Sequence, residues 1–127
     1  TIAPIQDRSG WLVRQSLIDR IGDAEGNAAY RLEVALDDRI EGFGVRTNDA
    51  ITRERRTLRA RYQLVDARSG EVMVDATAAS DAGIDVVNSE YATIAAENSA
   101  LERLAADVAD QIVTRLALFA RARPDRP

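Results

Sequence analysis

The fold is decided by residues 52–80, which read TRERRTLRARYQLVDARSGEVMVDATAAS. From Leu58 onward, apolar and polar side chains alternate, and this period of two is typical of a strand with one buried face. Residues 66–70 predict a turn, because they open with Asp and end with a Gly that tolerates a positive φ. The stretch therefore predicts one long β-hairpin. Its register is expected to be firmly set, since a slip by one residue would turn the arginine row toward the core.

The alternation assigns the side chains of this hairpin to two faces. Those expected to face the core are Leu58, Ala60, Tyr62, Leu64, Val72, Val74, Ala76 and Ala78. Those expected to face outward are Arg53, Arg55, Thr57, Arg59, Arg61, Gln63, Glu71, Met73, Asp75 and Thr77. One sheet face is therefore predicted to be apolar and the other charged.

Two more strands are predicted before the hairpin, a short one at residues 2–5 and a longer one at residues 30–37. The longer strand alternates with Tyr30, Leu32, Val34 and Leu36 facing inward. Residues 38–45 are less regular, and their two glycines indicate a bulge or a strongly twisted strand end. A turn is expected at residues 47–49, and residues 81–85 are expected to leave the sheet after the hairpin.

The first of two predicted helices begins near Gly10, behind a cap at Asp7 or Ser9, and ends at about Ile21. Its apolar stripe consists of Leu12, Val13, Leu17, Ile18 and Ile21. We expect Trp11 to anchor packing in the core rather than to stack on a ligand.

The second predicted helix covers residues 91–121 and is capped by Asn88 or Ser89. Its apolar stripe consists of Ile94, Leu101, Leu104, Ala105, Val108, Ile112, Leu116 and Phe119. A helix of this length spans about 46 Å, and so does a strand of about 14 residues. The helix is therefore expected to lie along the whole hairpin and to cover its apolar face.

These elements predict an α+β two-layer sandwich in the order β-α-β-β-β-α. It would have a four-stranded, mostly antiparallel sheet with both helices on one face. Residues 1–123 are expected to form a single domain and residues 124–127 a disordered tail.

The composition excludes several classes of function. The chain of 127 residues contains no Cys and no His, which rules out thiol catalysis, Cys/His zinc sites and a Ser-His-Asp triad. Its formal net charge of −4 argues against a nucleic-acid binder. No phosphate-binding loop or metal-spaced cluster is present, so no cofactor is expected. The pairs Asp37 with Asp38 and Asp81 with Asp85 have the chemistry to hold a hard cation, but solvated acids near turns are the ordinary interpretation.

The outward arginines of the hairpin are the candidate functional feature: Arg53, Arg55, Arg59 and Arg61. Outward acids are expected beside them, from Glu33 on one neighbouring strand and from Glu71 and Asp75 on the other. The arginines then form either cross-strand ion pairs on a solvated face or a guanidinium surface for phosphates and carboxylates. Cross-strand ion pairing is the ordinary interpretation. The count of arginines in the row exceeds that of the expected acids, and this excess keeps the second hypothesis open.

Three motifs, in this order, carry a resemblance to a known family. They are Asp7-Arg8-Ser9-Gly10 with Arg14-Gln15-Ser16-Leu17; Leu58-x-Ala60-x-Tyr62-x-Leu64-x-Asp66-x-x-Ser69-Gly70-x-Val72; and Tyr91-Ala92 followed by Ala95-Ala96-Glu97-Asn98-x-Ala100 and Ile112-x-x-Arg115-Leu116. Together they resemble the LPS-assembly lipoproteins of the LptE type, in their alphaproteobacterial form.

The resemblance implies a non-enzymatic lipoprotein on the periplasmic side of the outer membrane. It would plug an LptD-type β-barrel, help to assemble it and assist the delivery of lipopolysaccharide to the cell surface. The lipid-bearing N-terminal Cys of the family is absent, and we expect it upstream of Thr1. Two other hypotheses are a double-stranded-RNA-binding-like module, which the net charge opposes, and a periplasmic scaffold without a ligand.

Overall fold

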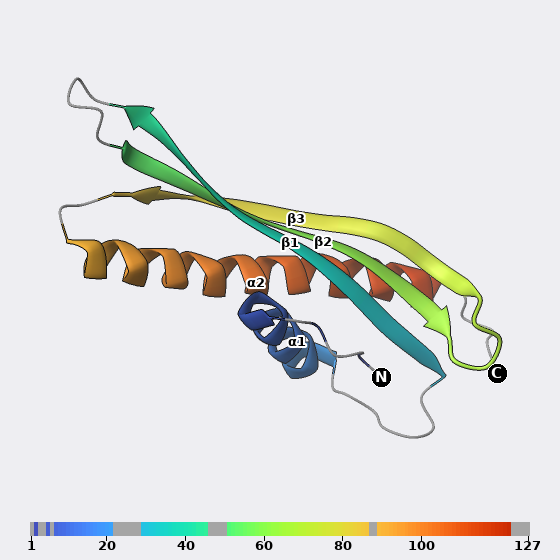
Figure 1. Cartoon of the computed structure of the whole chain (residues 1–127). Helices are drawn as coiled ribbons and strands as arrows, with labels where there is room; N and C mark the ends of the chain where they lie inside the picture. The colour runs from blue at the N-terminus through green and yellow to red at the C-terminus, as the bar shows by residue number, and fades with distance from the viewer. Residues whose placement is uncertain are drawn as a thin grey trace.

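The computed structural model describes residues 2, 5, 7–21, 29–45, 51–86 and 89–122. The elements follow in the order α1 (Asp7–Ile21), β1 (Tyr30–Val45), β2 (Ile51–Asp66), β3 (Val72–Asp85) and α2 (Glu90–Arg121). The strands form an antiparallel sheet in the order β1-β2-β3. Both helices lie on one side of this sheet, and no described segment covers the other side (Figure 1). The α+β class and the placement of the helices are therefore confirmed.

The predicted hairpin is formed by β2 and β3, in the register that places Ala60 opposite Ala78. In the turn, the Asp66 carboxylate accepts hydrogen bonds from the backbone N–H groups of Ser69 and Arg68 at 3.1 and 2.9 Å. These bonds lower the pKa of Asp66 below its ordinary value. Gly70 closes the turn with a φ of 78°, the left-handed conformation that its lack of a Cβ permits.

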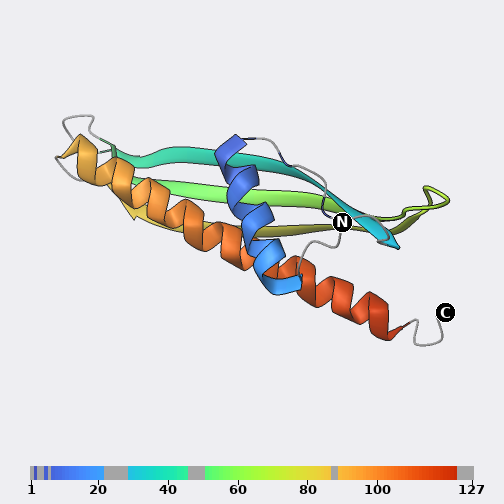
Figure 2. The same ribbon diagram turned by 90° about the horizontal axis from the view of Figure 1, so that it is seen from below.

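The core lies between the sheet and α2, which runs along the length of the hairpin (Figures 1 and 2). Its largest fully buried side chains are Val13, Leu17, Leu58, Leu104, Val108 and Ile112. Burial also raises the pKa of the Tyr62 phenol. The predicted N-cap of α2 is Ser89, whose hydroxyl accepts a hydrogen bond from the Ala92 N–H at 3.2 Å.

The helix α1 crosses α2 on the side away from the sheet (Figure 2). Its first turn packs closely against the preceding chain, because a Cβ on Gly10 would lie 2.6 Å from the carbonyl oxygen of Ile5. The Arg14 guanidinium donates hydrogen bonds to the Ile2 carbonyl at 3.3 and 3.2 Å. These contacts hold the start of the chain beside β1.

The sheet has three strands among the described residues, so the predicted four strands and the order β-α-β-β-β-α are not confirmed. Ile2 forms a single parallel bridge to Leu32, which is all that the described residues retain of the predicted first strand. The segment left for a strand before the first helix is short, because α1 already begins at Asp7, earlier than the predicted start near Gly10. Ser9 is consequently buried inside the helix and does not cap it.

One prediction about a strand end was wrong, because β3 continues through Asp85 and does not leave the sheet at residue 81, and Ile84 is buried beneath it. β1 pairs with β2 in one constant register from Tyr30 to Val45, which excludes the bulge near the glycines. The alternative expected there, a strongly twisted strand end, stays a prediction. The register shift lies in the hairpin instead, between Leu64 and Val65. The turn predicted at residues 47–49 and the tail at residues 124–127 lie outside the described residues.

Several side chains predicted to pack inside are exposed. Trp11 is 57% exposed and Val72 is 45% exposed, and Ile21 and Ile94 are also solvent-facing. The register shift accounts for Val72, because it places this residue opposite Val65 and out of line with the core row of β3. Trp11 lies off the buried face of α1, which consists of Ser9, Gly10, Val13 and Leu17 with Leu12 and Ile18 partly buried beside them.

Candidate functional site

The predicted arginine row lies on the open face of the sheet. Arg53, Arg55, Arg59 and Arg61 are all exposed and project from β2, away from the two helices. Strand alternation brings them to this face because Leu58, Ala60 and Tyr62 point toward α2. The sequence therefore predicted correctly which face carries these side chains.

Three of the four arginines pair with acids of β3. Arg61 donates to both carboxylate oxygens of Asp75, at 3.0 and 3.3 Å. Arg55 lies 3.5 Å from a carboxylate oxygen of Asp81, and Arg53 lies 3.6 Å from one of Asp85. The hydrogen bonds from Arg61 and then from Gln63 lower the pKa of Asp75 below its ordinary value.

Arg59 is the exception in the row. Its cross-strand neighbours are Asp37 and Ala79, but the Asp37 carboxylate is bound by Arg39 at 3.0 Å. Ala79 offers no charge. Within the described part of the chain, Arg59 therefore makes no ion pair.

The open face is electrically balanced overall. On the described strands it carries the basic residues Arg31, Arg39, Arg53, Arg55, Arg59 and Arg61 and the acidic residues Glu33, Asp37, Glu41, Asp75, Asp81 and Asp85. The expected excess of guanidinium over acids is thus absent. The sequence reasoning underestimated the acids because it did not extend β3 to Asp85, and because it left the acids of β1 beyond Glu33 out of the count.

A second group of charges, which the sequence analysis missed, lies on the helix-facing side of the sheet. We call it the inner polar cluster and define it as Asp38, Glu54, Arg56 and Glu97. Arg56 forms a two-bond ion pair with Asp38 at 2.7 and 2.9 Å, and its third donor reaches the Glu97 carbonyl oxygen at 3.0 Å. The Arg56 side chain is only 12% exposed. The hydrogen bond to Asp38 raises the pKa of Arg56, so its charge is permanent.

The Glu54 carboxyl of this cluster faces the Glu97 carboxyl. Three effects raise the pKa of Glu54 from 4.5 to about 6: the hydrogen bond that it forms with Glu97 when one of the two carboxyls carries a proton, then burial, then repulsion from Glu97. The sequence carried one indication of this cluster. Side chains alternate along β2, so Glu54 and Arg56 lie on the same face as the buried Leu58.

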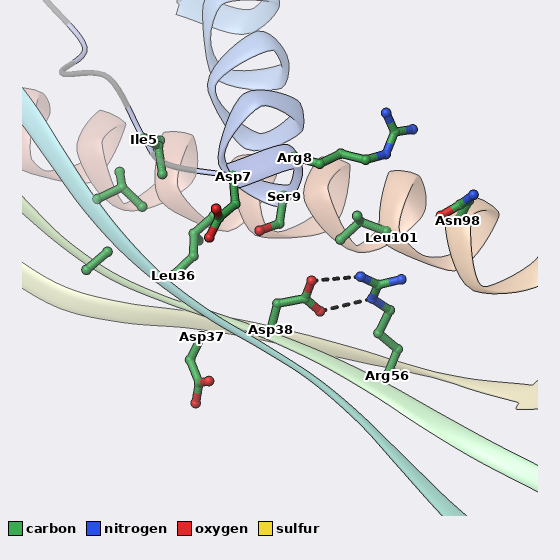
Figure 3. A pocket seen from close by; sticks show the side chains of 12 residues that line it. Ile5, Asp7, Arg8, Ser9, Leu36, Asp37, Asp38, Arg56, Asn98 and Leu101 are labelled. Carbon is green, nitrogen blue, oxygen red and sulfur yellow. Dashed lines mark hydrogen bonds and ion pairs between the residues drawn. The ribbon is translucent and has the colours of Figure 1, made fainter. Parts of the chain in front are cut away.

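A cleft of about 750 Å³ opens beside this cluster, between the first turn of α1, β1 and α2 (Figure 3). The Asp38–Arg56 pair lies across it, with Asn98 and Leu101 on the side of α2. Asp37 points to the opposite side of β1 from Asp38 (Figure 3). These two carboxylates therefore cannot share a cation, contrary to one of the chemistries considered above.

The other carboxylate pair, Asp81 and Asp85, faces the arginines and is engaged by them. In the part of the chain that the structure describes, no group of three metal-ligand side chains gathers. None of the described helices has the length and apolarity that a membrane crossing requires.

Comparison with known proteins identifies relatives of this fold. The LptE family model, described as lipopolysaccharide-assembly, matches residues 1–116. A comparison with curated proteins found no match. A candidate lipoprotein from Caulobacter crescentus has a similar structure, with 25% identity and a TM-score of 0.74 over 93% of this chain and 87% of the other.

Two more distant structures share the fold. Rare lipoprotein B from Shewanella oneidensis has 11% identity and a TM-score of 0.69, over 99% of this chain and 100% of the other. A minor lipoprotein from Acinetobacter baumannii has 17% identity and a TM-score of 0.70, over 92% and 90%. With a family match over nearly the whole length and this fold, the chain belongs to the LptE family of lipopolysaccharide-assembly proteins.

Proposed function

We propose that this protein is a non-enzymatic subunit of lipopolysaccharide assembly that plugs a β-barrel of the LptD type. The observation that carries the proposal is the family match over residues 1–116. Family membership favours this function over the nucleic-acid module and over the scaffold without a ligand. The net charge of −4 and the balanced open face also oppose binding to a polyanionic backbone.

The proposal includes a location. The protein acts on the periplasmic side of the outer membrane, held there by a lipid on a Cys upstream of Thr1. Its support is that the similar structures from Caulobacter, Shewanella and Acinetobacter are described as lipoproteins. Mass spectrometry of the protein expressed from its native gene would detect the acyl chains on an N-terminal Cys. An unlipidated N-terminus would contradict the anchor without affecting the fold.

The partner is tested by co-purification. We expect the full-length protein, tagged at its C-terminus and extracted in a mild detergent, to bring a large outer-membrane β-barrel protein with it. A Leu104→Ala variant is the control, because Leu104 is buried in the core and its loss weakens the fold on which any partner contact depends. Recovery of the intact protein alone would count against the barrel partnership.

Within this function, Arg53, Arg55, Arg59 and Arg61 are proposed to contact the anionic groups of lipopolysaccharide. Support comes from their exposure on one strand and from Arg59, which makes no ion pair within the described residues. The phosphates of lipid A are the candidate groups, because guanidinium binds phosphate through two parallel hydrogen bonds. The other three arginines would have to release their carboxylate partners before they could bind phosphate. Arg59 is therefore the primary contact.

A matched pair of double variants tests this surface. Arg59→Gln with Arg61→Gln is expected to weaken binding of labelled lipopolysaccharide roughly tenfold. Arg31→Gln with Arg39→Gln removes the same charge from β1 on the same face and should have little effect. Binding to wild type should also weaken at high salt. Equal losses in both variants would mean that only net charge matters, and equal binding by all three proteins would make the row purely structural.

A further inference from the structure

The inner polar cluster connects α2 to the sheet through one cation and three acids. Each of the three guanidinium nitrogens of Arg56 makes one hydrogen bond: two bind Asp38 and the third binds the Glu97 carbonyl oxygen. Arg56 therefore fixes the backbone of α2 at Glu97. Within the described residues, none of these bonds reaches the carboxyl group of Glu54 or Glu97.

The Glu54 carboxyl is short of hydrogen-bond donors. Its Oε1 is buried and has no hydrogen-bond partner among the described residues. The neighbours of Glu54 across the sheet are Gly42 and Ile84, which supply neither a charge nor a side-chain donor. The group that faces it is the Glu97 carboxyl, and two ionised carboxylates cannot hydrogen-bond to each other.

A single proton shared between Glu54 and Glu97 allows the two carboxyl groups to form a hydrogen bond. A carboxyl group that carries it can donate to the other, and the pair then has the single negative charge that the site tolerates. The other charged groups around the pair are Asp38 from β1 and Arg56 from β2, which neutralise each other. From α1, Asp7 and Arg8 line the neighbouring cleft with opposite charges, and the described inward side chains of β3 carry none.

We propose that Glu54 and Glu97 form a proton-dependent clasp that holds the N-terminal half of α2 on the sheet. In acid the shared proton joins helix and strand. When both groups ionise they repel each other, and the helix segment around Glu97 separates more readily from β2. This segment also carries the exposed apolar side chains Tyr91 and Ile94, so its release changes the surface that a partner meets.

The pH range follows from the shift at Glu54. Its pKa is raised from 4.5 to about 6, so the folded protein holds this proton more tightly than the unfolded chain does. The stabilisation is complete below about pH 4.5 and is lost as the pH rises through about 6. Allowing for solvent around a half-buried site, we expect the opening equilibrium of this segment to increase roughly tenfold between pH 4.5 and pH 7.5.

The experiment combines two NMR measurements on the whole chain. Carboxyl chemical shifts give the titration midpoint of Glu54, and hydrogen-exchange protection factors of amides 93–100, corrected for intrinsic exchange, give the opening equilibrium. Protection is expected to fall roughly tenfold across the range, while the amides near Ile112 change less.

Substitutions of Glu by Gln, which keep the shape of the side chain, test the contribution of the Glu54–Glu97 pair alone. Glu97→Gln supplies a permanent amide donor to Glu54, so its protection factors should become independent of pH and the midpoint of Glu54 should fall. Glu54→Gln should likewise remove the pH dependence. Glu102→Gln, which removes an exposed charge from the same helix, should behave as the wild type. A wild-type Glu54 midpoint near 4.5, or the same pH dependence in Glu97→Gln as in wild type, would overturn the proposal.

Discussion

Replacing Leu104 with Ala is the sharpest test of the two-layer core. Leu104 lies on α2 and is only 1% exposed, within the core cluster that includes Leu17 of α1 and Leu58 of β2. The change removes three carbon atoms, and the transfer contribution of about 0.8 kcal/mol each gives roughly 2.4 kcal/mol. A residual cavity adds to this amount, so the free energy of unfolding should fall by about 3–4 kcal/mol.

Urea melts followed by circular dichroism measure this change, and Leu118→Ala provides the matched control. Leu118 is on the same helix but is 54% exposed, so its loss should alter the free energy of unfolding by less than about 1 kcal/mol. An effect below about 0.5 kcal/mol for Leu104→Ala, or equal effects for the two variants, would refute the packing of α2 described above.

Three further substitutions test local features through the same melts. Asp38→Asn should cost about 1–3 kcal/mol, because it leaves the largely buried Arg56 charge without its anion, whereas a loss below about 0.5 kcal/mol would show that the pair is solvated. Gly10→Ala should cost about 1–3 kcal/mol, since its Cβ would lie 2.6 Å from the Ile5 carbonyl oxygen; an unchanged midpoint would mean that α1 can shift outward freely. Gly70→Ala should cost about 1 kcal/mol because of its φ of 78°, and a stabilised variant would contradict the turn geometry.

The central hairpin could be predicted because its alternation is long and regular. The run from Leu58 to Leu64 leaves one register that buries every apolar side chain. The end of β3 could not be predicted in the same way, since residues 79–83 are rich in Ala and Gly, which have weak strand preference. Pairing with β2 decides that end, and pairing is a tertiary property.

The sequence predicts which face of the sheet carries the candidate arginines, but not which acids pair with them. Alternation places Arg53 and Arg61 on the solvent side, but their acids depend on the cross-strand register. Arg61 reaches diagonally to Asp75 although Thr77 lies directly opposite. The inner polar cluster was missed because Glu54 and Arg56 look like surface residues, and their burial depends on where α2 crosses the sheet.

The central claim, a role in lipopolysaccharide assembly, is tested most directly in cells of the source bacterium. After depletion of the full-length protein, the amount of lipopolysaccharide at the cell surface is measured by labelling intact cells. The account predicts that surface lipopolysaccharide falls while it accumulates inside, and that Leu118→Ala restores it fully whereas the destabilised Leu104→Ala restores it less. Unchanged surface lipopolysaccharide in fully depleted cells would contradict the account.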